Sequence, residues 1–212
     1  MGGEEQQALM VTSVGEAREI AVTGRGECNL TLLVVGGGGA FGYGGGAGSG
    51  YLEYRSLQVS AGTVLTATVG YQRQASSLAI SGGETVMAQP GQDAPGNSNG
   101  GDGYSGGGGY GYDYGGDGGS DGGDGEDGSD YICGRGTGED VSLYSFTTWS
   151  LTPGDGGQAY HGHYYGGGGG GVLVNGAGPQ ASQYQGQGYG GGSSGWSFYG
   201  EGLPGLILLE VN

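Results

Sequence analysis

The stretch CNLTLLVVGGGG, residues 28–39, joins an apolar run directly to four successive glycines. Leucine, valine and threonine favour extended backbone, so residues 28–35 predict a β-strand. Glycine has no side chain to pack and loses the most backbone entropy on ordering, so the tract ends that strand. Strand-like runs and glycine tracts alternate through much of the chain, which predicts an all-β fold carrying long glycine-rich loops.

The composition bounds the classes of protein that the chain can represent. Glycine supplies 61 of the 212 residues, and the formal net charge is −16. Glycine does not recur at every third position, which excludes collagen. So acidic a chain repels nucleic-acid phosphates and anionic membrane surfaces. No apolar run reaches the ~20 residues of a membrane-spanning helix. We therefore expect neither nucleic-acid binding nor membrane insertion.

The order of the segments predicts one glycine-rich β domain over residues 1–212. Residues 9–90 read as strands, 91–140 as a Gly/Asp/Tyr-rich insertion, and 141–212 as strands mixed with glycine tracts. The nearly continuous apolar run 206–211 is typical of a central strand covered on both faces. We therefore expect the first and last segments of the chain to share one sheet system.

Short glycine-containing turns predict how neighbouring strands pair. Residues 18–23 and 28–35 flank a glycine-rich turn, as do residues 51–59 and 63–69, and each pair is expected to form a hairpin.

Two further strand predictions rest on the local pattern. Residues 78–81 and 84–87 flank Gly82-Gly83, which predicts a hairpin with a type I′ turn. Residues 141–149 are expected to form a strand with one face made of Leu143, Ser145, Thr147 and Trp149.

The middle zone allows two structures. One is a disordered, solvated acidic loop. The other is a set of extended glycine helices with three residues per turn, packed side by side so that their amides pair between neighbours. In that case the tracts 166–171 and 190–192 would join the same bundle of polyglycine-II helices.

The acidic residues of this zone form a candidate calcium site, because calcium prefers several oxygen ligands on flexible backbone. The alternative is an acidic face that only attracts counterions. The candidate ligands are Asp113, Asp117, Asp121, Asp124, Glu126, Asp127 and Asp130.

Two modifications are predicted if the chain is secreted. Cys28 and Cys133 are expected to form a disulfide, which would be worth about 4 kcal/mol in the chain-entropy model; the alternative is two buried free thiols. Asn29-Leu30-Thr31 matches the glycosylation acceptor pattern.

Tyrosine is unusually frequent, with 16 residues concentrated among the glycines. Its rigid ring and polar tip suit interfaces, although the rings can equally fill the space that glycine leaves. The candidate assembly or binding residues are Tyr104, Tyr110, Tyr112, Tyr114, Tyr164, Tyr165 and Tyr189.

No grouping of Ser, His, Asp or Cys has the context of a catalytic site, so we expect a non-enzymatic protein with no cofactor other than calcium. The leading hypothesis is an extracellular structural or assembly protein: a matrix, filament or adhesive component. One alternative is an extracellular module that recognises a protein or glycan through its glycine-rich loops. Another is divalent-cation or mineral binding through the acidic tract. The expected partners are a second copy of the chain or another extracellular protein or glycan. The start of the chain lacks a signal-peptide pattern.

Several segments in this order resemble the glycine-rich domain in the ectodomains of anaplastic lymphoma kinase and leukocyte tyrosine kinase, and related invertebrate glycine-rich proteins. The segments are VVGGGG at 34–39, GGGAGSGYL at 44–52, LQVSAGTVL at 57–65, QGQGYGGG at 185–192 and GLPGLILLE at 202–210.

This resemblance implies a tumour-necrosis-factor-like β-sandwich joined to a lattice of glycine helices. The receptor versions bind cytokine ligands. This sequence has no kinase, membrane span or cysteine-rich neighbour, so receptor signalling is not implied for it.

Overall fold

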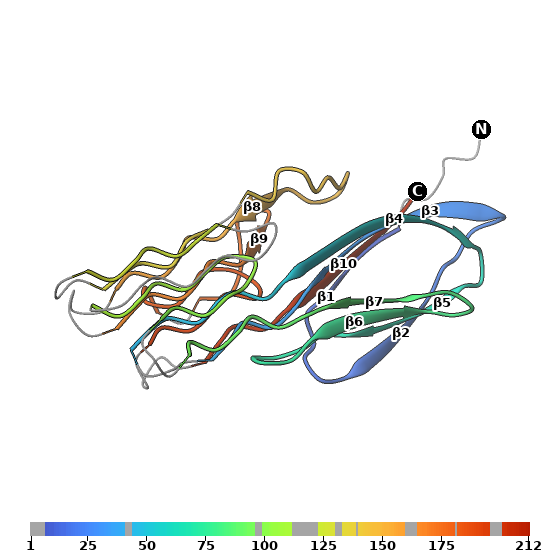
Figure 1. Ribbon diagram of the computed structural model, residues 1–212. Helices are drawn as coiled ribbons and strands as arrows, with labels where there is room; N and C mark the ends of the chain where they lie inside the picture. Colours follow the sequence, from blue (N-terminus) through green and yellow to red (C-terminus); the bar gives the residue numbers. More distant parts are fainter. Residues whose placement is uncertain are drawn as a thin grey trace.

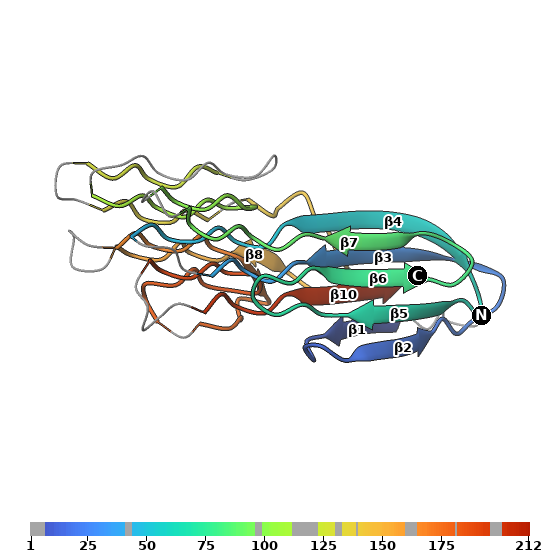
Figure 2. The ribbon, with the colours of Figure 1, turned by 60° about the horizontal axis from the view of Figure 1, so that its bottom comes forward.

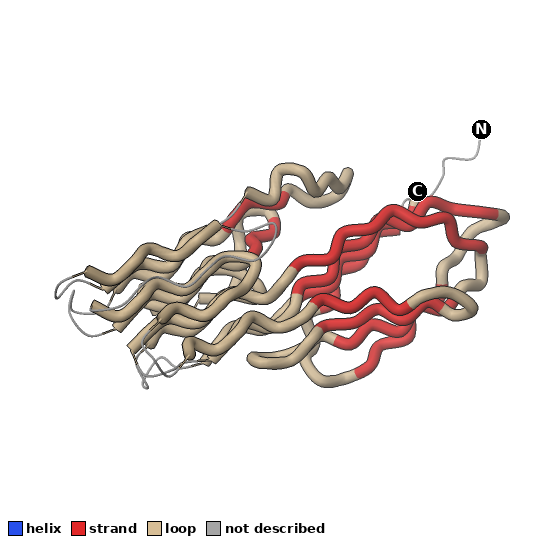
Figure 3. The backbone as a smooth tube through the Cα atoms, in the orientation of Figure 1, coloured by secondary structure: helices blue, strands red, loops and turns tan. Residues whose placement is uncertain are grey.

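The computed structural model describes most of the chain, and no helix occurs in that part. Its longer β-strands gather in one half of an elongated molecule, while extended glycine-rich segments and a few short strand residues fill the other half (Figures 1 and 3). The described residues are 7–40, 44–95, 99–111, 123–129, 133–138, 140–159, 165–180, 182–195 and 201–212.

The strand-rich half is a sandwich of two antiparallel four-stranded sheets (Figure 2). In the first sheet the order is β1-β10-β3-β4. These strands are β1 (Gln7–Val11), β10 (Leu206–Val211), β3 (Glu27–Val35) and β4 (Leu52–Ser60). The predicted all-β sandwich is confirmed, and so is the pairing of the chain's first and last segments.

The second sheet has the order β2-β5-β6-β7. Its strands are β2 (Ala17–Ala21), β5 (Val64–Thr68), β6 (Ser76–Ile80) and β7 (Thr85–Ala88). A small additional sheet pairs β8 (Leu151–Pro153) with β9 (Val172–Val174).

Strand β10 is buried along its whole length because it is covered on both faces. Ile207 and Leu209 point into the core between the sheets, together with Leu32 of β3. Leu206 and Leu208 belong to a second apolar cluster on the outer face of the first sheet. The continuous apolar run is thus explained by burial on both faces, as predicted.

Two of the three predicted hairpins are wrong. The chain passes from one sheet to the other between β2 and β3, and again between β4 and β5. The glycine turns do reverse the chain, but each turn carries it into the other sheet, so the two strands that flank the turn are not hydrogen-bonded neighbours. A local turn signal carries no information about which sheet the next strand joins.

The hairpin β6–β7 is confirmed, with Ile80 N–H donating to the Glu84 carbonyl at 3.0 Å. Its turn differs from the predicted type I′, which needs two left-handed residues. Only Gly82 is left-handed, at φ +72°.

The predicted strand at 141–149 is also wrong. The segment is a series of turns against the outer face of the first sheet, and Leu143 is 85% exposed. Tyr144, Phe146 and Trp149 pack on the outer apolar cluster instead. Of these rings only that of Trp149 belongs to the predicted face, so the packing of Tyr144 and Phe146 overrides the period-2 pattern.

Candidate functional site: the glycine bundle and its junction

The half of the molecule without long strands is built from side-by-side extended segments (Figure 1). We call these segments the glycine bundle. It starts where β3 ends at Val35 and β7 ends at Ala88, away from the paired residues Gln7 and Val211. The bundle comprises residues 36–40, 44–50, 89–95, 99–111, 123–129, 133–138, 154–159, 166–171, 182–195 and 201–205.

Backbone hydrogen bonds in the bundle repeat every third residue. In the segment that begins at Gly44, Gly46 and Ser49 donate to one neighbour, at the carbonyls of Gly108 and Ser105. Ala47 and Gly50 donate to a second neighbour, and Gly48 and Tyr51 to a third. The acceptor numbers fall as the donor numbers rise, so each of these neighbours runs antiparallel.

The segment 166–171 follows the same rule with three other neighbours. Gly166 and Gly169 donate to Gly44 and Ala47, and the intervening residues donate in turn to 134 and 137, and to 184 and 187. Here acceptor numbers rise with donor numbers, so these neighbours are parallel. Each segment is therefore bonded on three sides, which a β-strand, with two hydrogen-bonding edges, cannot achieve.

Only glycine fits at most positions of the bundle. A Cβ atom built on Gly46 would lie 2.0 Å from the Gly167 carbonyl oxygen, and one on Gly186 would lie 1.8 Å from that of Gly169. Several of the other buried side chains are small, and Ala47, Ser49 and Ser193 are fully buried. Close backbone approach is thus a condition for the hydrogen bonds that hold the segments together.

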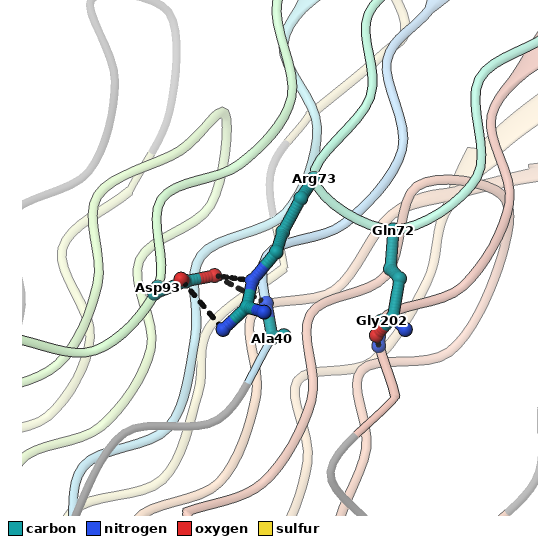
Figure 4. A network of polar contacts seen from close by, with 5 residues as sticks. All are labelled: Ala40, Gln72, Arg73, Asp93 and Gly202. Atoms are coloured by element: carbon teal, nitrogen blue, oxygen red, sulfur yellow. Dashed lines mark hydrogen bonds and ion pairs between the residues drawn. The ribbon is translucent and has the colours of Figure 1, made fainter.

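A polar network joins the bundle to the sandwich (Figure 4). Arg73, in the turn between β5 and β6, contacts both carboxylate oxygens of Asp93, at 2.9 Å from Nε and 2.8 Å from Nη2. Asp93 also accepts from Ala40 N–H at 2.8 Å. Beside it, Gly202 N–H donates to the Gln72 side chain at 3.3 Å. Three glycine-bundle segments are thereby tied to one turn of the second sheet.

Arg73 has a left-handed backbone, at φ +61°, which is unusual for a residue with a side chain. Its N–H donates to the Gly38 carbonyl at 3.0 Å. The pKa of Arg73 is raised above its ordinary value, mainly by the hydrogen bond to Asp93.

Glu210 fastens the 141–150 segment over the outer face of the first sheet. Its side chain is 1% exposed, and its carboxylate accepts from the N–H groups of Thr147 and Thr148, both at 2.8 Å. The Thr148 hydroxyl adds a third hydrogen bond, at 2.6 Å. Burial raises the pKa of Glu210, but the hydrogen bonds together outweigh it, so the pKa lies below the ordinary value.

The predicted tyrosine surface stays a prediction, except at Tyr104. Tyr104 is buried, and its hydroxyl donates to the Asp140 carbonyl at 2.9 Å, so it is a core residue and the prediction of an interface role is wrong. Tyr189 packs half-buried against the outer apolar cluster, and burial raises its pKa. Tyr110 and Tyr165 are half-buried in the bundle half. Tyr112, Tyr114 and Tyr164 lie outside the described residues.

The structure describes part of the acidic tract. Asp124, Glu126 and Asp127 are exposed, and Glu126 accepts from the Arg135 N–H at 3.1 Å. Among the described residues, no group of three or more His, Cys, Asp or Glu side chains is placed to hold a metal ion. Asp113, Asp117, Asp121 and Asp130 lie outside the described residues, so the calcium site stays a prediction.

Cys28 and Cys133 are both free thiols, so the predicted disulfide is wrong. Cys28 lies seven residues before the end of β3, which is about 23 Å along a strand, whereas Cys133 lies in the glycine bundle beyond that end. A disulfide needs Cα atoms within about 7 Å. Burial raises the pKa of the Cys133 thiol, against backbone hydrogen bonds at Gly111 and Tyr165 that lower it.

Asn29 is exposed on β3, and its side-chain oxygen accepts a hydrogen bond from Gln58. Its backbone also pairs with Asn212. The acceptor tripeptide therefore lies in a strand and not in a loop, and its glycosylation stays a prediction.

Sequence reasoning missed the junction residues Arg73 and Asp93, and it also missed Glu210. Arg73 is one of the five basic residues of the chain, and Glu210 is the only charge in the final apolar run. These two signals were visible, but their partners are 20 and 62–63 residues away, and nothing local indicates them.

No helix in the described part of the chain is long and apolar enough to cross a membrane. No protein-family model matches the sequence, and no curated protein matches it.

Proposed function

We propose that this chain is a non-enzymatic extracellular structural or assembly protein, and that its glycine segments are polyglycine-II helices forming a rigid assembly surface. The observation that carries the proposal is the three-residue period of hydrogen bonds to three neighbours. A polyglycine-II helix has three residues per turn and directs successive amides to three different sides.

A bundle of this kind supports assembly for two reasons. Its segments are fixed by close backbone packing, so little conformational entropy remains to be lost when a partner binds. A polyglycine-II helix at the outside of such a bundle can also bond a further neighbour on its outward side. Its amides and carbonyls on that side offer the same pattern to a glycine segment of a second copy, much as an edge strand does in a sheet.

The test is whether the chain associates with itself through the bundle. Light scattering and sedimentation over a wide range of concentration should show reversible growth beyond the monomer. Hydrogen exchange of the assembled material should then show added protection in bundle segments and not in the second sheet. A monomer at all concentrations would contradict the assembly function.

A matched pair of variants locates the contact. Gln158 lies exposed in the bundle and Gln58 lies exposed on β4. Gln158→Glu adds charge to the bundle of an already acidic chain and should weaken association, whereas Gln58→Glu should leave it unchanged. An equal effect of the two substitutions would indicate general charge repulsion and would count against a contact on the bundle.

A recognition module for a protein or glycan is the second candidate. It is favoured by the placement of the bundle at the end of the molecule opposite the paired residues Gln7 and Val211 (Figures 1 and 2). A chain immobilised near Gln7 would present the bundle outward. Saturable binding to a glycan array by a protein that stays monomeric would favour this function over assembly.

The extracellular location rests on the resemblance to glycine-rich ectodomains. Detection of the native protein in the secreted or the intracellular fraction tests the location independently of assembly.

A further inference from the structure

The two sheets of the sandwich enclose a cavity of about 190 Å³ on one side. On the opposite side, β3 and β4 of the first sheet contact β7 of the second. The cavity lies beside β1 and β2, the edge strands that face each other at the end of each sheet. It is therefore a gap between the sheets at their open edge and not part of the glycine bundle.

The cavity wall is almost entirely hydrocarbon. Val22, Leu65, Leu209 and Val211 are buried side chains of the wall, and Leu9 and Ile20 are half-buried. Among the residues that the structure describes, no charged side chain lines the cavity and Gln7 supplies the only polar one. A water molecule inside would need two to four polar partners, which this wall does not offer.

The mouth of the cavity lies at the protein surface. Ala8 and Ala21 border the cavity and are exposed, so the cavity reaches the surface along the two edge strands. The Gln7 amide donates a hydrogen bond to the Thr23 hydroxyl, which links β1 to the end of β2. The Gln7 side chain therefore lies where it can contact a ligand whose polar end remains outside the cavity.

We propose that this cavity binds a small apolar molecule, a hydrocarbon ring or an alkyl chain of about eight carbons, with any polar end held at Gln7. The size supports this ligand class, because an apolar cavity of about 150 Å³ lined by similar side chains stays dry and binds benzene. The driving force is the removal of the ligand's apolar surface from water.

The probes are toluene and n-heptanol, titrated into the full chain and followed by amide and methyl NMR. Both should give saturable shifts at Leu9, Ile20 and Leu65, with no change in the bundle. Heptanediol serves as the matched polar control, because one of its hydroxyls would be buried without a partner. It should bind at least about tenfold more weakly than n-heptanol.

A pair of isoleucine substitutions separates cavity binding from general effects on the sheet. Ile20 and Ile80 both pair with Leu65, on opposite sides of β5, but only Ile20 lines the cavity. Ile20→Phe fills the space and should weaken toluene binding by at least about tenfold. Ile80→Phe should leave the affinity unchanged.

Three results would overturn the proposal. The first is the absence of saturable shifts in the unmodified protein, which needs no variant to fold. The second is equal binding by the Ile20→Phe and Ile80→Phe proteins. The third is a set of shifts at the cavity that appears on raising the protein concentration without ligand, because the occupant would then be a second copy.

Discussion

Gly169 shows how little space a single position of the bundle contains. A Cβ atom on this residue would lie 2.1 Å from the Ser105 carbonyl oxygen and 3.1 Å from the Ser49 nitrogen. That nitrogen donates to the same Ser105 carbonyl at 3.0 Å. Ser49 and Ser105 cannot move apart without breaking the hydrogen bond between them. A methyl group on residue 169 therefore cannot be accommodated without a large energetic cost.

We expect Gly169→Ala to lower the free energy of unfolding by about 3 kcal/mol or more, because backbone atoms must shift. Gly83→Ala is the matched control, since its Cβ would lie 3.4 Å from the nearest atom, the Ile80 Cγ2. The control should change stability by no more than about 1 kcal/mol. Urea unfolding measures the stability of both variants. An equal loss of stability in the two would show that the backbone around Gly169 can shift at little energetic cost.

Glu210 predicts a specific dependence of stability on pH. Its pKa is lowered in the folded state, so its stabilisation is present above the unfolded pKa of about 4.3 and is lost as pH falls through the folded value. We expect Glu210→Gln to cost about 1–3 kcal/mol at neutral pH, because an amide offers one acceptor where the carboxylate uses two.

The loss in free energy of unfolding caused by Glu210→Gln should become smaller as the pH is lowered below the range in which an ordinary glutamate titrates. Urea midpoints of both proteins across this range measure the difference. A loss independent of pH would mean that the hydrogen bonds to Thr147 and Thr148 do not depend on the charge of Glu210.

At the scale of single residues, the sequence did not show which side chains of the 141–149 segment would be buried. The alternation predicted a strand with Leu143 on one face, but Leu143 is exposed, and the rings of Tyr144 and Phe146 pack against Tyr54 at centroid distances of 5.2 and 5.9 Å. The alternation of residues along a segment does not show which of its two faces is buried when the covering surface comes from a distant part of the sequence.

Among the elements, the strands were more predictable than their partners. The ends of β3 and β10 follow from where apolar runs meet glycine or polar residues. Their adjacency does not, because β10 is more than 170 residues beyond β3 and pairs Leu206 with Val35. Long-range pairing is set by which faces can be buried together, a property of the assembled sheets.

The junction turn offers a test at the scale of elements. Arg73→Ala removes the ion pair with Asp93 but keeps the left-handed backbone strain, whereas Arg73→Gly removes both. We expect Arg73→Ala to be the more destabilising, by about 1 kcal/mol, although glycine is usually the less favourable of the two.

Thermal unfolding of the two variants and the parent measures this order. The ion pair itself contributes little, because the Arg73 side chain is 55% exposed and solvent screens it. If Arg73→Gly were the less stable variant, the turn would not retain its left-handed conformation when the arginine side chain is absent.

For the whole molecule, the sequence left two predictions open for the glycine tracts: an ordered bundle or a disordered loop. Composition could not decide between them, because the stabilising hydrogen bonds of Gly44–Tyr51 reach segments near residues 89, 105 and 190. Each tract is ordered only by the others and by the sandwich from which they extend. The order of such a set is therefore collective.

Hydrogen exchange tests this collective order. The amides of residues 46–51 and 166–171 should exchange nearly as slowly as those of β10, and they should become exposed together in denaturant. The exposed turn at Leu143 should exchange rapidly and serves as the internal reference. Rapid exchange in both glycine segments would contradict an ordered bundle.

The pairing of Gln7 with Val211 has a consequence for protein engineering. Neighbouring strands are about 4.8 Å apart, so these two residues could replace the two ends of a tight surface loop in an unrelated host. A host carrying such a graft would display the glycine bundle as a stiff projection, with no long linker on either side.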